Sequence, residues 1–242
     1  IAQAQRISRQ SEALGIQAVP LTHASYPDCL RETSDPPAIL YIKGNTKCVG
    51  ATNSIAIIGT REPTDFATNS AFSIARVFAE KDFVIVSGLA LGCDTHAHEG
   101  CIAAEGQPVA VLAHGLDSVH PRSNSSLADH ILTSGGALVS EYPVGKKPQP
   151  SFFIDRDRIQ SGLSKAVVVV ETTEAGGTMH TAAFAQEQGR KVAVVAHPKG
   201  KFTNSQISGN LKLLAEKTTF VISGLNDLHD LATQLTGKPN ER

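Results

Sequence analysis

The stretch Ser54-Ile-Ala-Ile-Ile-Gly-Thr-Arg61 joins a run of apolar residues directly to a glycine turn. This pattern is typical of a buried strand that ends in a tight turn. Glycine turns also follow later apolar runs, at Ser87-Gly88, His114-Gly115 and Ala175-Gly-Gly-Thr178. Because the carboxyl ends of parallel strands lie along one edge of a sheet, these turns should meet there. Backbone N–H groups and helix N-termini at such an edge bind anions, so the sequence predicts a phosphate-binding surface.

Apolar runs and segments of helical spacing alternate along the chain from residue 54. We predict strands at 55–58, 83–87, 108–112, 137–140, 166–170, 191–195 and, more weakly, 218–222. The predicted helices are 65–80, 93–105, 123–134, 151–161, 178–188, 205–216 and a final one near 225–235 that ends at Gly237-Lys-Pro239. This alternation predicts an α/β, Rossmann-like fold, with a parallel sheet covered by helices on both faces.

Residues 1–50 differ from the rest because prolines interrupt them and forbid a long helix. They contain a short helix-like start and strand-like segments at 16–21 and 38–43. We therefore expect a small N-terminal extension, 1–50, packing on a Rossmann-like domain, 51–242. Since residue 1 is Ile and not Met, we leave open whether further domains flank this chain in the gene product.

The composition narrows the classes of function. The 242 residues are 41% hydrophobic and carry a net charge of −1, so any attraction for a polyanion has to be local. Aromatic residues make up 5%, with no Trp, which disfavours binding by extensive base stacking. The sequence has no apolar run of transmembrane length, and its four cysteines form no C-x-x-C pair. We expect a cytoplasmic protein that has no contact with a membrane.

Several motifs, taken together, resemble one known family. They are Gly59-Thr60-Arg61, Ser87-Gly88-Leu-Ala-x-Gly-x-Asp94 followed by His98, Pro121-x-x-Asn124, Ser140-Glu141-x-Pro143, Arg156-x-Arg158-Ile159 and Gly162-Leu163-Ser164. In this order they resemble the DNA-processing protein A (DprA/Smf) family. The resemblance implies an extended Rossmann fold, a homodimer, sequence-independent binding of single-stranded DNA, and loading of a RecA-type recombinase in natural transformation and recombination.

The chain departs from the family pattern at three places. Asp157 stands where the family usually has Asn, Ala175-Gly-Gly-Thr178 replaces a Ser-Gly-Ser turn, and His197-Pro198 replaces Pro-Gly. These departures leave open a diverged relative that senses a nucleotide.

We predict two kinds of nucleic-acid contact. The phosphate-binding turns would supply Gly59, Thr60, Arg61, Ser87, Gly88, Gly176, Gly177 and Thr178, with His98 close to the crevice. Lys146 and Lys147, on a Pro-rich loop, would follow the DNA backbone, as would Lys199 and Lys201 with less support.

In the predicted helix 151–161, the roles of two arginines and two aromatic residues remain open. Arg156 and Arg158 point about 200° apart on a helix, so we expect one to face DNA and the other to pin the loop through Asp155 or Asp157. Of the aromatic pair at positions 152 and 153, we expect at least one ring to anchor the core, leaving the other free to stack on a base.

Catalytic, metal and cofactor sites are not expected. Asp94, His96, His98 and Glu99 open a predicted helix, where Asp94 suits the N-cap better than a metal site. The chain lacks the G-x-G-x-x-G and P-loop patterns of dinucleotide and ATP sites. The rival is a nucleoside-phosphate hydrolase, since the turn near Glu171 and Glu174 resembles that of the cytokinin-activating enzymes, but the helix glutamate of that motif is missing. We expect a binding protein, dimeric through a late helix with Ile207, Leu211 and Leu214, and not an enzyme.

Overall fold

A single mixed sheet runs through the molecule. The structure is a computed structural model that describes residues 2–198, 200, 202–203 and 205–237. Within these residues nine strands pair in the order β1-β2-β6-β5-β4-β3-β7-β8-β9. Their bounds are β1 Ile16–Pro20, β2 Ile39–Gly44, β3 Ser54–Ile58, β4 Val84–Ser87, β5 Pro108–Val111, β6 Ala137–Ser140, β7 Ala166–Val169, β8 Lys191–Val195 and β9 Phe220–Ile222.

Strands β3 to β9 are parallel to one another, as the alternation of strands and helices predicts. Every residue of β3, β4, β5, β6 and β7 is buried. Burial of both faces is the reason why these strands are continuous apolar runs without alternation. The predicted fold class is confirmed.

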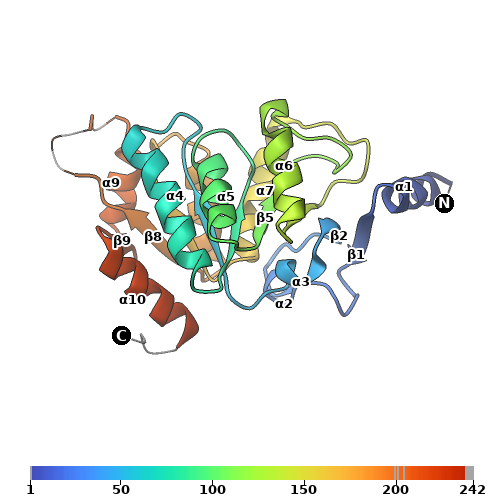
Figure 1. The fold of residues 1–242 in the computed structure, drawn as a ribbon, viewed down its shortest axis with the longest axis horizontal. Coiled ribbons are helices and arrows are strands. Elements are labelled where there is room, and N and C mark those ends of the chain that lie inside the picture. Colours follow the sequence, from blue (N-terminus) through green and yellow to red (C-terminus); the bar gives the residue numbers. More distant parts are fainter. Residues whose placement is uncertain (1, 199, 201, 204, 238–242) are drawn as a thin grey trace.

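Helices cover both faces of the sheet (Figure 1). Their bounds are α1 Ala2–Ala13, α2 Asp28–Arg31, α3 Thr46–Val49, α4 Asp65–Ala79, α5 Cys93–Ala103, α6 Ser125–Thr133, α7 Pro150–Gly162, α8 Thr178–Glu187, α9 Ser208–Leu214 and α10 Leu225–Thr236. Side chains of α4, α5 and α10 pack with Ile55 and Ile57 on one face, and those of α7, α8 and α9 pack with Ala56 and Ile58 on the other. Each predicted helix after residue 54 is present, shifted by at most a few residues at its ends.

The N-terminal extension contributes to the same sheet. β2 pairs with β6 and β1 pairs with β2, both antiparallel, so the sheet is continuous across residue 50. Helix α1 lies beyond β1 at one end of the molecule, whereas α10 lies at the opposite end (Figure 1). The antiparallel strands correct the expectation of an entirely parallel sheet.

The order of the strands reverses at β3, and this reversal determines where a ligand can bind. From β3 the chain proceeds through β4, β5 and β6 on one side, then returns to pair β7 with β3 on the other. A crevice forms at the carboxyl ends of the two strands where such a reversal occurs. The turns that begin at Gly59 and Thr172 therefore face each other across this point.

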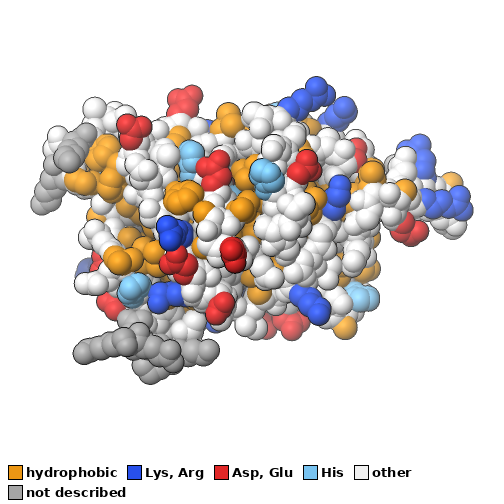
Figure 2. Space-filling model, viewed as in Figure 1, with side chains coloured by type: hydrophobic (Ala, Val, Ile, Leu, Met, Phe, Trp, Pro, Cys, Tyr) orange, Lys and Arg blue, Asp and Glu red, His pale blue; other side chains and the backbone are white. Residues whose placement is uncertain are grey.

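The surface carries no large patch of one sign in the view of Figure 2, where acidic and basic side chains are interspersed over the middle of the face. None of the helices in the described part of the chain has both the length and the apolar character needed to cross a bilayer.

Candidate nucleic-acid interface

A pocket of about 410 Å³ opens at the carboxyl ends of β3 and β7. We call it the switch-point pocket. Its walls are the turn after β3, the segment between β7 and α8, and one side of α7. Seven of the predicted site residues line it: Gly59, Thr60, Arg61, Arg156, Gly176, Gly177 and Thr178.

Arg61 forms one wall of the pocket together with Phe153. The guanidinium carbon of Arg61 lies 5.3 Å from the centroid of the Phe153 ring, which is a cation–π distance. Arg61 is exposed, and in the described part of the chain its guanidinium forms no hydrogen bond or ion pair. The ring thus holds in place a cation whose five N–H donors remain free for a phosphate.

The start of α8 forms the facing wall. Within the described ranges, no acceptor is found for the backbone N–H groups of Gly177 and Thr178. A Cβ added to Gly177 would meet nothing within 4 Å, so a ligand can approach its backbone closely. Free N–H groups at the positive end of a helix dipole form an anion site.

Other predicted backbone donors are already used within the protein. The N–H of Thr60 donates to the carbonyl of Glu171 at 2.7 Å, and that of Gly176 donates to Thr173 at 3.0 Å. The N–H of Gly88 donates to Asp94 at 3.1 Å. These residues shape the pocket or lie behind it, but they have no free N–H for a ligand.

Arg156 is buried at the back of the pocket, with 5% of its surface exposed. Its Nη1 donates to the carbonyl of Val111 at 2.9 Å, and its Nε lies 3.3 Å from a carboxylate oxygen of Asp157. The hydrogen bond of Nη1 joins α7 to β5, whereas within the described residues Nε has no hydrogen-bond acceptor, and Arg156 remains part of the pocket lining.

Two further predicted site residues stabilise the turn after β4. The Ser87 hydroxyl donates to the carbonyl of Ile57 at 2.7 Å, and neither Ser87 nor Gly88 lines the pocket. Asp94 accepts N–H groups from Gly88 and from Ala90, and burial raises the pKa of its carboxyl. The N-cap of α5 is Gly92, so the prediction that Asp94 caps this helix is wrong.

Asp157 places an acid in the pocket wall. Burial raises the pKa of its carboxyl to about 7, and the charge of Asp94 adds to this, although Arg156 opposes both. Gln160 on α7 and Thr181 on α8, which the sequence analysis did not single out, also line the pocket. The sequence could have indicated both residues, because residues three apart on a helix lie on the same face. Gln160 follows Asp157 by three residues on α7, and Thr181 follows Thr178 by three on α8.

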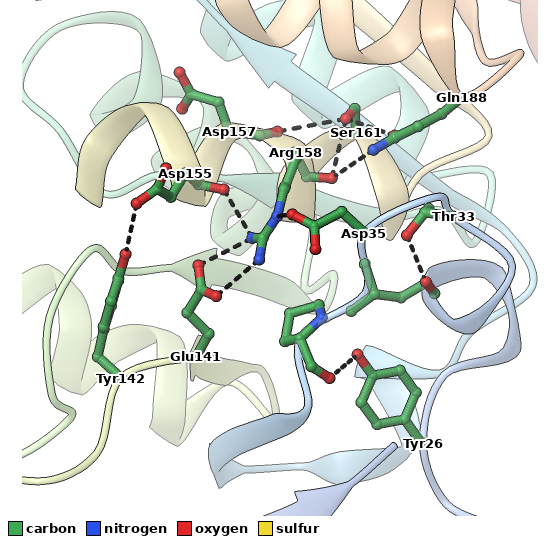
Figure 3. Close-up of polar contacts among 12 residues, drawn as sticks. Tyr26, Thr33, Asp35, Glu141, Tyr142, Asp155, Asp157, Arg158, Ser161 and Gln188 are labelled. Atoms are coloured by element: carbon green, nitrogen blue, oxygen red, sulfur yellow. Dashed lines mark hydrogen bonds and ion pairs between the residues drawn. The ribbon is translucent and has the colours of Figure 1, made fainter. Parts of the chain in front are cut away.

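Arg158 does not line the pocket, and its guanidinium lies in a separate cluster beside Glu141 and Asp35 (Figure 3). It donates to both oxygens of Glu141, at 2.9 and 2.8 Å, and to Asp35 at 2.9 Å. A fourth bond goes to the backbone carbonyl of Asp155. This cluster ties the N-terminal extension to α7. Of the two acids expected to hold an arginine here, Asp155 contributes only its backbone carbonyl to Arg158, and Asp157 pairs with Arg156.

The paired phenylalanines lie on the surface of α7 and not in the core. Phe152 stacks on Tyr142 with 4.1 Å between ring centroids, and the Lys146 ammonium lies 5.1 Å from the Phe152 ring. Both Phe152 and Phe153 are half-buried and belong to no core cluster. The expectation that one of them anchors the core is wrong, because the hydrophobic side of this helix is supplied by Ile159 instead.

The remaining predicted residues lie outside the pocket. Lys146 and Lys147 are exposed on the loop that precedes α7. His98 is fully buried, and burial lowers the pKa of its ring to about 3. Among the residues described, no group of three or more His, Cys, Asp or Glu side chains could hold a metal ion. Lys199, Lys201 and the stop at 238–239 lie outside the described residues.

The comparisons with known proteins agree with this architecture. Residues 17–233 match the model of the family described as DNA recombination-mediator protein A. DNA processing protein DprA of Bacillus subtilis is 38% identical over 202 residues, which cover 84% of this chain and 67% of that protein. The Escherichia coli protein Smf is 37% identical over 75% of this chain, which corresponds to only 48% of its own length.

Two solved structures have the same fold. DNA processing protein A from Streptococcus pneumoniae aligns with a TM-score of 0.81 and 28% identity, over 92% of this chain and 77% of that one. The protein from Helicobacter pylori, described for its single-stranded DNA binding mode, aligns with a TM-score of 0.79 and 26% identity, over 92% and 96% of the two chains. From its motifs, its fold and these relatives, the chain belongs to the DprA/Smf family of DNA processing proteins.

Proposed function

We propose that this protein acts in the cytoplasm, binds single-stranded DNA without regard to sequence through the switch-point pocket, and passes the strand to a RecA-type recombinase in DNA uptake and recombination. The observation that carries the proposal is the pairing of a free cation with free N–H donors. Arg61, held on Phe153, faces the same pocket as the N–H groups of Gly177 and Thr178, for which the described residues supply no acceptor.

This arrangement suits a phosphate and its neighbouring base. A phosphate accepts hydrogen bonds from the start of α8 and a forked pair from Arg61, neither of which depends on base identity. The half-buried Phe153 and the Arg61 plane offer flat surfaces on which any base can stack. Lys146 and Lys147 extend the basic path along the neighbouring loop.

The relatives support the same class of ligand. The Helicobacter pylori protein is described by its single-stranded DNA binding mode, and it covers almost the same length of chain. The Bacillus subtilis and Streptococcus pneumoniae relatives are named for DNA processing. We extend this role to the present chain as a proposal, since it spans about half the length of some relatives.

The hydrolase alternative receives no support from the two candidate glutamates. Glu171 is not part of the pocket wall, and its carboxylate binds Thr64 and His197. Glu174 is on the surface, paired with Lys212. A general base must reach the proton that it removes, and neither carboxylate is free to do so. We therefore propose no catalytic step.

A homodimer completes the proposal. One pocket binds few phosphates. When two pockets of a dimer bind the same strand, the second binding event is intramolecular, and this raises the overall affinity. Leu211 on α9 is 45% exposed, whereas Ile207, which directly precedes this helix, is buried. We propose that Leu211 lies at the dimer interface.

The test is a titration by fluorescence anisotropy of single-stranded DNA, duplex DNA and nucleoside monophosphates, at about 50 mM and about 200 mM salt. We expect single strands of different sequence to bind alike, more tightly than duplex, and more weakly at the higher salt concentration. Preferential binding of a monophosphate, or release of free base from it, would favour the nucleotide-sensing or hydrolase alternative.

A further inference from the structure

Glu171 pins both ends of the turn that carries Arg61. Its backbone carbonyl accepts the N–H of Thr60 at 2.7 Å, just before Arg61. Its side chain accepts the N–H of Thr64 at 2.9 Å and the Thr64 hydroxyl at 2.6 Å, just after the turn. Thr64 in turn caps α4 by accepting the N–H of Ala67. One residue just after β7 thus holds both ends of the turn that carries Arg61.

His197 supports Glu171 from the opposite side. Its Nε2 lies 3.1 Å from the Glu171 carboxylate oxygen that accepts the Thr64 hydroxyl, and its Nδ1 lies 3.3 Å from the carbonyl of Val195. Both ring nitrogens therefore face acceptors.

The Glu171–His197 pair is shielded from water. The side chain of His197 is fully buried and that of Glu171 is 2% exposed. The rings of Phe66 and Phe202 both lie 5.0 Å from the His197 ring, at angles of 57° and 85°. Removal of His197 would leave the buried Glu171 carboxylate without this hydrogen-bond partner.

The protonation of Glu171 agrees with this geometry. Burial alone would raise the pKa of its carboxyl, but the hydrogen bonds from His197 and Thr64 outweigh burial and hold that pKa below its usual range. Glu171 is therefore an anion that accepts three side-chain or backbone donors at its carboxylate. Without His197, only the two donors of Thr64 would remain.

We propose that Glu171 and His197 are positioning residues that hold Arg61 over the pocket, so that a side chain in the loop after β8 controls the geometry of the phosphate contact. Neither residue touches the ligand, since neither lines the pocket. The effect on DNA affinity rests on the proposed function, whereas the effect on the turn does not.

The turn is tested first without DNA. Hydrogen exchange of peptides that cover residues 59–67 is compared between the wild type, His197→Ala, His197→Gln and Glu171→Gln. We expect the amides of Thr60 and Thr64 to exchange about tenfold faster in His197→Ala, with a smaller effect in His197→Gln, which keeps one donor. His130→Ala, an exposed histidine on α6, is the matched control and should leave the turn unchanged. Unaltered exchange at both amides in the His197→Ala and Glu171→Gln proteins overturns the proposal.

The second measurement asks whether His197 acts through Arg61. We expect His197→Ala to weaken the binding of a single-stranded oligonucleotide about three- to tenfold, and to have less than about a twofold effect when Arg61 is already Ala. An equal loss in both backgrounds would show a general effect on folding and would contradict the proposal. If the wild type binds no single strand while exchange responds as expected, the proposed function fails and the positioning of the turn stands.

Discussion

The guanidinium of Arg156 lies directly against the backbone of Gly88, where a Cβ would come within 1.6 Å of Nη1. No side chain can occupy position 88 unless the arginine moves. The contact also explains why Gly88 is glycine although it does not line the pocket. Arg156 uses this space to reach the carbonyl of Val111 and so joins α7 to the sheet behind the phosphate site.

The first prediction is that Gly88→Ala destabilises the protein strongly. The added methyl group displaces a buried guanidinium and leaves Asp94 and Asp157 without their counter-charge. We expect the free energy of unfolding to fall by about 3 kcal/mol or more, measured by urea denaturation. Gly177→Ala is the control, since a Cβ there meets nothing within 4 Å, and it should cost less than about 0.5 kcal/mol. Equal stabilities of the two variants would contradict this assignment.

Replacement of Arg158 should lower the stability of the protein without changing its affinity for single-stranded DNA. Its replacement by Ala leaves Glu141, whose side chain is 17% exposed, without its forked partner. We expect a loss of about 3 kcal/mol of stability, and an affinity for single-stranded DNA within about twofold of the wild type under conditions where both are folded. In comparison, Arg76→Ala removes an exposed pair with Glu80 and should cost at most about 1 kcal/mol. A large loss of affinity in folded Arg158→Ala would place this residue at the DNA instead.

Asp157 should make phosphate binding depend on pH. Because its pKa is raised to about 7, the carboxyl is mostly neutral at lower pH and charged at higher pH. The folded state holds this proton more tightly than the unfolded chain does, so the associated stability is present at low pH and is lost as the pH rises through about 7. The charged form also repels an anion in the pocket. We expect single strands to bind about three- to tenfold more tightly at about pH 6 than at about pH 8.

Asp157→Asn removes this titration and is the decisive variant. Its affinity should change less than about twofold over the same range and should exceed that of the wild type at about pH 8. The same pH dependence in both proteins would exclude Asp157 as its source.

The central strands and their helices could be predicted from sequence because the evidence for them is local. Ser54 to Ile58 is an apolar run that ends in glycine, and burial on both faces makes it continuous. The antiparallel pairing of β2 with β6 could not be predicted, because it joins residues near 42 to residues near 139. Nothing in either segment alone specifies the direction of its partner.

A site residue could be predicted from sequence where its own turn places it in the pocket. It could not be predicted where contacts with residues far away in the chain determine its position. Arg61 lines the pocket because its turn follows β3 directly. Arg158 has the same sequence context as Arg156, but Asp35, which is 123 residues away, and Glu141 bind it outside the pocket. The contact of Phe153 with Arg61 likewise joins two segments far apart in the chain.

The dimer prediction concerns Leu211. Replacement of this exposed leucine by Glu should place a charge in an apolar interface and shift the protein from dimer to monomer at micromolar concentration, measured by sedimentation. Leu14→Glu, at a leucine of similar exposure near the other end of the molecule, is the control and should remain dimeric. A wild type that sediments only as a monomer would refute the proposed dimer.

The most direct test of the phosphate-binding account is the affinity of Arg61→Ala for single-stranded DNA as a function of salt, with Arg76→Ala as the matched control. The account predicts a loss of about 1.5–3 kcal/mol that is the same for every sequence, and a salt dependence reduced by about one charge. The affinity of Arg61→Lys should lie between those of the wild type and Arg61→Ala, since lysine keeps the charge but not the forked pair of donors. An unchanged affinity in folded Arg61→Ala, or a loss that depends on base sequence, would contradict the account.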